Sequence, residues 1–180
     1  MKAIRLAIPD VILLEPKVFS DARGYFYESY NRRAFQQATG VDPNFVQDNQ
    51  SQSAKGVLRG LHYQIRQAQG KLVRVLEGEI FDVAVDVRKS SPTYGQWVGE
   101  TLSAANKRGM WVPEGFAHGF MVTSETAVVF YKTTDYWAAE HERCIAWNDP
   151  KLAIQWPATA PILSAKDQSG ATLDSAETFS

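Results

Sequence analysis

The chain has only three histidines, and two of them lie in short segments rich in glycine and aromatic residues. His62 lies within residues 59–64 and His118 within residues 113–120, whereas His141 lies outside both segments. A neutral imidazole accepts a proton near pH 7, and it is also a common ligand of transition metals. These two segments therefore predict either a general base or a metal site.

The sequence around His62 is compatible with a general base. Lys71 follows nine residues later, at the start of an apolar segment. A nearby cation lowers the pKa of an imidazole, which then stays neutral and able to accept a proton at pH 7. The alternative is a structural histidine held by a backbone carbonyl, and this segment alone leaves the two interpretations open.

Residues 59–64 have the pattern of a β-strand, whose side chains point alternately to its two faces. On that pattern we expect Arg59 on one face, and His62 with Gln64 on the other.

The second segment has the spacing Pro-x-Gly-x-x-His, formed by Pro113, Gly115 and His118. It resembles a turn-and-strand motif of the cupin superfamily, whose metal-binding members use this His as a ligand. Such a site also needs a His-x-His pair and a downstream Glu on an earlier strand, and Gln64 stands where the second His would be. Two separate histidines without a carboxylate at ligand spacing make a weak metal site, so we predict no bound metal.

Tyr131 and Trp137 form a third group of interest. Tyr131 lies in a β-branched and aromatic segment, residues 127–134, that predicts a strand, and Trp137 follows it. A tyrosine that faces a pocket can donate a proton, and a tryptophan can stack on a planar base. The alternative for Tyr131 is a core ring whose hydroxyl reaches the surface.

Other classes of chemistry have no sequence support. No Gly-x-Gly-x-x-Gly follows a predicted strand, and the chain has neither a P-loop sequence nor a Gly-x-Ser-x-Gly elbow. The net charge is −1 and no Lys/Arg block exceeds a pair, so we expect no nucleic-acid partner. Cys144 is the only cysteine, which excludes an intrachain disulfide and predicts a buried small side chain.

The chain has no apolar run near the ~20 residues that a membrane span needs. Its first sixteen residues are interrupted by Arg5, Pro9 and Asp10, unlike the apolar core of a signal peptide. We therefore expect a soluble, cytoplasmic protein without a membrane partner.

The remaining patterns predict the elements that position these residues. Alternation predicts a half-buried strand at residues 81–87, and further strands are expected at residues 71–76 and 3–14, the latter broken at Pro9. One helix is expected, capped by Asn31 and stopped by Gly40. The polar tail, residues 168–180, is expected to be loosely held. Many short strands with little helix predict one all-β domain, a sandwich or barrel, over residues 1–180.

Six blocks, taken together, carry a resemblance to a known family. They are residues 23–28, 47–51, 57–64, 70–74, 113–120 and 147–150, in that order. The chain resembles the dTDP-4-dehydrorhamnose 3,5-epimerases, cupin-fold enzymes of dTDP-L-rhamnose synthesis, from about Ile8 to Asp167. The resemblance implies an all-β, cupin-type jelly roll with a few short helices and a homodimer with swapped N-terminal strands. It also implies a dTDP-sugar substrate, epimerised at C3 and C5, and no cofactor.

The resemblance also implies a role for each site residue. His62 is expected to be the general base, paired with Asp167, and Tyr131 the general acid on the opposite face of the sugar. Lys71 is expected near the C4 oxygen. Trp137 stands where the family usually has a tyrosine that stacks on thymine. The expected substrate-binding residues are Arg23, Glu28, Gln47, Asn49, Arg59, Lys71, His118, Trp137, Glu142 and Lys166.

Three alternatives remain open from the sequence. The first is an epimerase that acts at one carbon only, C3 or C5. The second is a cupin that binds a sugar nucleotide without catalysis, and the third is a metal-dependent cupin oxygenase. The presence of His62, Tyr131 and Lys71 together favours the double epimerase.

Overall fold

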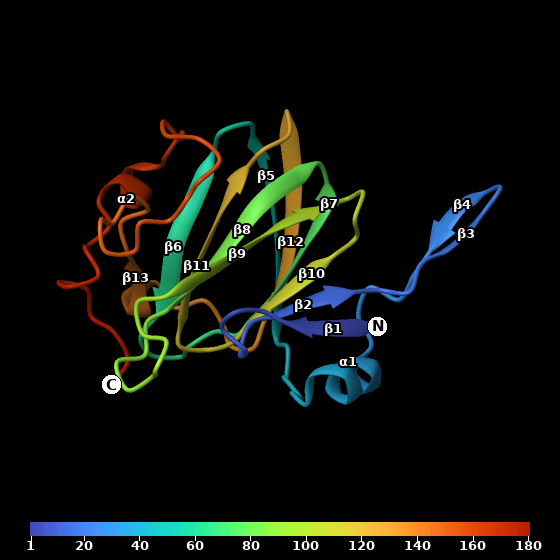
Figure 1. Ribbon diagram of the computed structural model, residues 1–180, viewed down its shortest axis with the longest axis horizontal. Helices are drawn as coiled ribbons and strands as arrows, with labels where there is room; N and C mark the ends of the chain where they lie inside the picture. Colours follow the sequence, from blue (N-terminus) through green and yellow to red (C-terminus); the bar gives the residue numbers. More distant parts are fainter.

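Two antiparallel sheets face each other in the computed structural model, which describes residues 1–180 (Figure 1). In spatial order, the larger sheet contains β1 (Lys2–Arg5), β2 (Ile12–Glu15), β10 (Gly109–Val112), β7 (Lys71–Glu77), β12 (Thr126–Thr133) and β5 (Gln47–Ala54). The smaller sheet contains β13 (Glu142–Cys144), β6 (Leu58–Gln64), β11 (Phe116–Val122), β8 (Glu79–Asp86) and β9 (Trp97–Ser103). The predicted all-β sandwich is confirmed.

The main hydrophobic core fills the space between the sheets. Val73 and Val75 of β7 contribute to it from the larger sheet, and Ile80 and Phe120 contribute from the smaller one. Alternate residues of each strand point inward, so period-two apolar patterns in the sequence become one continuous apolar layer. This layer packs the two sheets against each other, and a polar cavity lies beside it, lined in part by β6 and β12.

Strand β8 is buried on both faces, so the prediction of a half-buried strand is wrong. Its outward residues Val83 and Val85 pack under Leu152 and Leu173 of the C-terminal segment. Asp82 precedes Val83, points to the opposite face of the strand and is fully buried as well. A buried carboxylate needs polar partners, which Asp82 finds in the site described below.

Strand β6 contains one extra residue relative to its neighbour β11. His62 pairs with His118 and Arg59 pairs with Phe120, so three steps along β6 match two along β11. A bulge of this kind shifts the alternation of side chains. The prediction that Arg59 and His62 lie on opposite faces is therefore wrong, and both line one cavity.

Two short helices lie at the edges of the sandwich. Helix α1 (Arg32–Thr39) begins after Asn31, whose side chain accepts a hydrogen bond from the Ala34 N–H, and it ends at Gly40 in the left-handed conformation, as predicted. Helix α2 (Ala165–Gln168) begins after Ser164 and carries Asp167. No helix of the chain is both long enough and apolar enough to cross a membrane.

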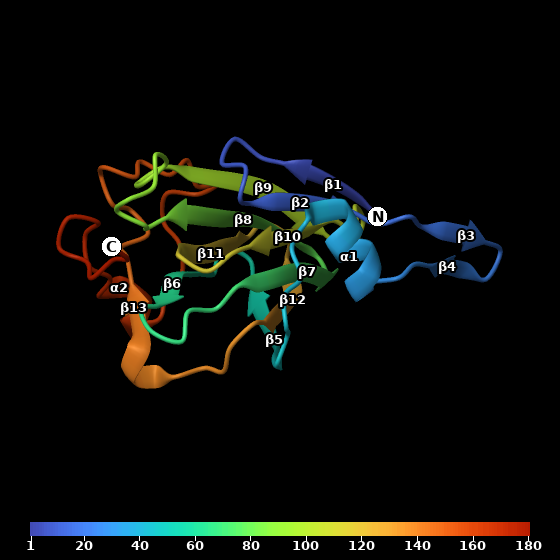
Figure 2. The same ribbon diagram turned by 90° about the horizontal axis from the view of Figure 1, so that it is seen from below.

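A two-stranded ribbon, β3 (Phe19–Asp21) and β4 (Gly24–Phe26), projects away from both sheets (Figures 1 and 2). Its aromatic side chains Phe19, Tyr25 and Phe26 are exposed. A two-stranded ribbon with no sheet beneath it has little stability of its own. These rings therefore form an apolar surface that the rest of the chain does not cover.

The C-terminal tail is held more firmly than the sequence suggests. Leu173 is buried, and Phe179 packs beside Tyr63 with ring centroids 6.1 Å apart. The Phe179 N–H donates to the Val87 carbonyl at 3.1 Å, and the Lys89 N–H donates to the Phe179 carbonyl at 2.8 Å. The expectation of a loosely held tail failed because these two apolar anchors are widely spaced among small polar residues.

We expect the β6 bulge to tolerate no side chain at Gly60. Its φ is +138°, and an added Cβ would lie 2.5 Å from the Gly119 Cα. Gly60→Ala should lower the free energy of unfolding by about 3 kcal/mol, because backbone strain and a backbone clash add together. Chemical denaturation measures this change.

Gly24→Ala is the matched control. Gly24 also has a positive φ, +130°, but nothing lies within 4 Å of the added Cβ. This variant should lose only the smaller strain contribution. Equal losses in the two variants would contradict the clash with Gly119.

Candidate active site

A cavity of about 310 Å³ opens between the two sheets and is completed by the C-terminal segment. Nine of the residues expected from the sequence line it: Arg59, His62, Lys71, His118, Tyr131, Trp137, Glu142, Lys166 and Asp167. Ser51, Phe120 and Ser164 also line it and were not foreseen. The structure thus gathers residues from positions 51 to 167 around one space.

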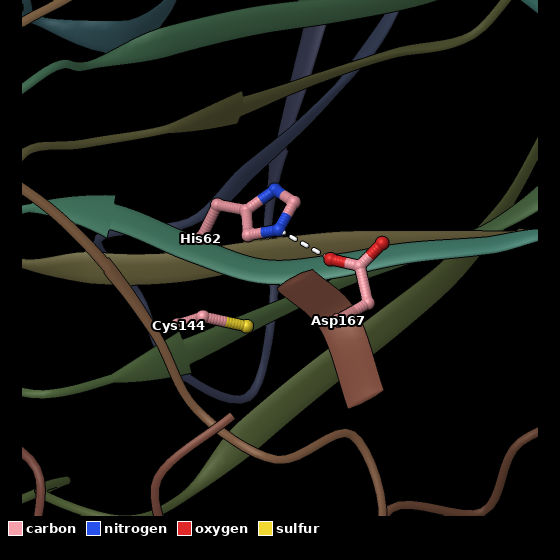
Figure 3. Close-up of side chains that lie close together, drawn as sticks. All are labelled: His62, Cys144 and Asp167. Carbon is pink, nitrogen blue, oxygen red and sulfur yellow. Dashed lines mark hydrogen bonds and ion pairs between the residues drawn. The ribbon is translucent and has the colours of Figure 1, made fainter. Parts of the chain in front are cut away.

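His62 and Asp167 form a close pair in this cavity (Figure 3). The distance from His62 Nε2 to Asp167 Oδ1 is 2.6 Å. Ser164 Oγ donates to the other carboxylate oxygen at 2.7 Å, and the Gly60 N–H approaches Oδ1 at 3.4 Å. Burial alone would raise the pKa of Asp167, but the hydrogen bonds from His62 and Ser164 lower it to about 2. Asp167 is therefore a carboxylate at neutral pH.

His62 is a neutral imidazole in this setting. Burial lowers its pKa, and the positive charges of Lys166 and Lys71 lower it further, against the opposing effect of Asp167. A carboxylate can only accept a hydrogen bond, so the proton between the pair belongs to Nε2 of His62. Nδ1 then carries a free lone pair, and it points away from Asp167 (Figure 3). This nitrogen is available to take a proton.

Lys71 places a buried cation beside the histidine. It is the first residue of β7, and its Nζ lies 3.4 Å from the His62 carbonyl oxygen. Burial lowers its pKa to about 8, while the negative charges of Glu142 and Asp82 oppose that shift. Most of Lys71 is therefore still protonated at pH 7, and it can stabilise negative charge that forms in the cavity.

Tyr131 enters the same cavity from the opposite sheet. It belongs to β12 of the larger sheet, whereas His62 belongs to β6 of the smaller one (Figure 1). Burial raises the pKa of the Tyr131 hydroxyl, and the charge of Glu142 raises it further. Tyr131 therefore keeps its proton. His62, which can accept a proton, and Tyr131, which can donate one, therefore line the same cavity from two different sheets.

A second His–Asp pair lies behind the first, and its carboxylate was missed in the sequence. His118 Nε2 lies 2.7 Å from Asp82 Oδ1, and Asp82 is fully buried. The other oxygen of Asp82 has no hydrogen-bond partner. Asp82 falls at a polar position of the strand predicted at residues 81–87, and its pairing with His118 across β8 and β11 depends on a register that the sequence does not reveal.

A neighbouring hollow of about 300 Å³ shares Tyr131 and Trp137 with the main cavity. Gln47 and Asn49 of β5 line it, joined by a hydrogen bond of 2.9 Å. The backbone N–H of Trp137 donates to Gln47 Oε1 at 3.1 Å, and the residue as a whole is exposed. The structure thus brings these three predicted binding residues together beside the catalytic candidates.

Glu142 and Lys166 form an ion pair of 2.9 Å at the cavity wall. In contrast, Arg23 and Glu28 do not reach the cavity. Arg23 lies in the projecting ribbon and pairs with Asp21, while Glu28 accepts a hydrogen bond from Asn31. Within one chain, the structure therefore unites all the predicted site residues except these two.

Cys144 lies next to the first His–Asp pair. Its Sγ, a ring nitrogen of His62 and a carboxylate oxygen of Asp167 lie within 4.8 Å of one another (Figure 3). Burial raises the pKa of the Cys144 thiol to about 11, so it is not a thiolate nucleophile. The chain contains no other group of three such ligands, and Cys144 is only partly buried rather than fully buried as expected.

Comparisons with known proteins show which family the chain belongs to. A family model described as dTDP-4-dehydrorhamnose 3,5-epimerase matches residues 5–175. A protein of that name from Pseudomonas aeruginosa is 68% identical over 180 residues, which covers 99% of each chain.

Solved structures are similarly close. The dTDP-6-deoxy-D-glucose-3,5-epimerase of Legionella pneumophila, crystallised with dTDP-4-keto-L-rhamnose, has a TM-score of 0.95 at 51% identity, covering 98% of this chain and 94% of that one. The dTDP-4-dehydrorhamnose 3,5-epimerase of Bacillus anthracis, with TDP and PPi bound, has a TM-score of 0.92 at 49% identity, covering 95% and 98%. The predicted cupin-type jelly roll is confirmed by this likeness. The chain therefore belongs to the dTDP-4-dehydrorhamnose 3,5-epimerase family of isomerases.

Proposed function

We propose that the protein inverts C3 and C5 of dTDP-4-dehydro-6-deoxy-D-glucose and forms dTDP-4-dehydro-L-rhamnose for dTDP-L-rhamnose synthesis. The observation that carries this proposal is a neutral His62 and a protonated Tyr131 on two walls of one cavity that also holds Lys71. The Legionella pneumophila neighbour, crystallised with dTDP-4-keto-L-rhamnose, supports this choice of substrate class.

The reaction requires a base and an acid on opposite sides of the sugar ring. A C–H bond next to a ketone can lose its proton because the electron pair spreads onto oxygen as an enolate. The 4-keto group activates both of its neighbours, C3 and C5. Inversion follows when the proton leaves from one face and a new proton arrives at the other. This chemistry needs acid–base groups and charge stabilisation, and it requires no cofactor.

His62 supplies the base. Nδ1 accepts the proton from carbon, and the imidazolium that results donates through Nε2 to the Asp167 carboxylate 2.6 Å away. Asp167 thus fixes the tautomer before the step and stabilises the positive charge after it. Tyr131 returns a proton from the other wall. General acid–base catalysis of this kind contributes ~10²–10⁴-fold to the rate.

Lys71 stabilises the enolate oxygen. The developing negative charge at O4 lies in a cavity with little solvent, where a fixed cation has its largest effect. His118, held by Asp82, is a neighbouring group that can hydrogen-bond the same oxygen. The nucleotide then extends toward Gln47 and Trp137, whose ring provides a flat surface for the base.

The diphosphate calls for arginine or lysine, because the guanidinium fork matches phosphate oxygens. Arg59 and Lys166 line the cavity, but Arg23 lies in the exposed ribbon. We include in the proposal a homodimer in which the ribbon crosses to the partner, so that Arg23 and Glu28 serve the partner's cavity. The exposed rings of Phe19, Tyr25 and Phe26 would be covered by the same contact.

We expect solvent deuterium at both C3 and C5. Incubation of dTDP-4-dehydro-6-deoxy-D-glucose with the protein in deuterated water, followed by NMR of the sugar ring, measures this exchange. His62→Asn should slow exchange at both carbons by at least ~10²-fold, because the base is lost.

Tyr131→Phe separates proton removal by His62 from proton return by Tyr131. It should retain proton removal by His62 but release product with its original configuration at one carbon or both. Exchange at a single carbon in the parent protein would replace the double epimerase with a one-carbon epimerase. Binding without any exchange would instead favour a non-catalytic sugar-nucleotide cupin.

The pH profile of kcat/KM should be bell-shaped, with activity falling at both low and high pH. His62 must be neutral, and its pKa is lowered, so activity rises as pH passes a value below the usual ~6.5 of histidine. Lys71 must be charged, so activity falls as pH rises through about 8. The fall should approach about tenfold for each further pH unit.

Lys71→Arg identifies the group behind the basic limb. Arginine stays protonated across this range, so the fall near pH 8 should disappear even if the maximal rate decreases. A basic limb that stays in place in this variant would assign it to another group.

Mixed dimers test whether the ribbon serves the neighbouring cavity. Arg23→Ala and His62→Asn chains should each be weakly active alone. When co-expressed, the heterodimer has one cavity with both groups intact, so activity should return to about one quarter of the parental value. No recovery, together with a weak Arg23→Ala parent, would place Arg23 at its own chain's cavity.

A further inference from the structure

We propose that His62, Cys144 and Asp167 form a binding site for a thiophilic divalent ion such as Zn²⁺, and that the bound ion inhibits the enzyme. The binding stands on the geometry of these three side chains alone. The inhibition rests in addition on the proposed function, because it acts through His62.

The three ligands come from three separate elements that meet at one point. His62 lies on β6, Cys144 lies directly opposite it on β13, and Asp167 lies on α2. Their ligand atoms lie within 4.8 Å of one another, and two of them are already 2.6 Å apart. In a tetrahedral zinc site, bonds of ~2.0–2.3 Å place ligand atoms ~3.3–3.8 Å apart. Small side-chain rotations are therefore enough to enclose an ion.

The donor set selects a soft ion. Nitrogen, sulfur and carboxylate oxygen together suit Zn²⁺ and its neighbours, whereas Mg²⁺ and Ca²⁺ prefer oxygen alone. The thiolate of Cys144 and the carboxylate of Asp167 would carry two negative charges, which balance the charge of the ion. A water molecule from the cavity would complete the fourth position, since Asp167 and His62 both line that space.

The proton balance is simple. When the ion binds, the Cys144 S–H bond breaks, an S–metal bond forms and the thiol proton passes to solvent. The proton on Nε2 of His62 gives way to a metal–nitrogen bond, and Nδ1 takes up a proton in its place. One proton is released in total, and no oxidation or reduction occurs.

The shift of the His62 proton from Nε2 to Nδ1 explains the inhibition. Nδ1 is the nitrogen that takes the substrate proton in the proposed mechanism, and in the metal-bound form it already carries one. The ion also occupies the carboxylate that would stabilise the imidazolium. Cys144 itself has no part in the proposed reaction: it does not line the cavity, and the hydrogen bonds of its thiol go to the backbone oxygens of Gly60 and Ile145.

Cobalt absorption tests the binding without reference to activity. We expect Co²⁺ titration of the parent protein to give a thiolate-to-cobalt charge-transfer band in the near ultraviolet. Cys144 is the only cysteine, so any such band reports this site. Cys144→Ala should lack the band. Absence of the band in the parent protein would overturn the proposal.

Zn²⁺ titration of the epimerisation rate tests the inhibition. The parent protein should lose activity and regain it on addition of a chelator, while Mg²⁺ should have no effect. Cys144→Ala should keep its basal rate and require at least about tenfold more Zn²⁺ for the same loss. Equal sensitivity of the two proteins would overturn the proposal.

The two readouts separate the possible failures. A cobalt band in a protein without epimerase activity would refute the proposed function and leave the metal site intact. Epimerase activity in a protein without the band would refute the metal site and leave the proposed function intact.

Discussion

The hydrogen bond between His62 and Asp167 joins two parts of the chain that lie 105 residues apart. It is made between strand β6, in the middle of a sheet, and the single-turn helix α2. Its two partners also depend on each other for their charge states. The neutral imidazole and the ionised carboxylate exist because burial acts on one and hydrogen bonds act on the other. Lys71 and the C-terminal segment contribute to the site through this pair: Lys71 lowers the pKa of His62, and the C-terminal segment supplies Asp167.

The site concentrates polar groups where a protein would otherwise place apolar ones. Lys71, Asp82 and His118 are all buried. Each is held by partners or by opposing charges, since an isolated buried charge is strongly unfavourable. The free oxygen of Asp82 is an exception, because it is buried without a partner. The apolar layer between the sheets, which includes Val73 and Phe120, stabilises the fold and offsets the cost of burying these polar groups.

Local signals in the sequence were enough for some of the elements, such as α1, β7 and β12, but not for others, such as the ribbon of β3 and β4. They were not enough for the pairings between the elements. Asn31 and Gly40 delimit α1 because capping and a left-handed residue act within one turn. The bulge that places Arg59 beside His62 depends instead on the register of β6 against β11. The burial of Val83 and Val85 depends on a C-terminal segment that covers β8, some seventy to ninety residues later in the chain. Asp167 was found through resemblance to a family, because no local pattern connects it to His62.

Helix α2 is four residues long, too short to be stable by itself in water. It nevertheless carries Asp167 and Lys166, and Ser164 caps its first turn, so three residues of the cavity wall depend on one short helix. Its local opening would detach all of them together while both sheets remain intact. Inactivation by heat should therefore precede melting of the sandwich, and the chain can be catalytically silent while it is still folded.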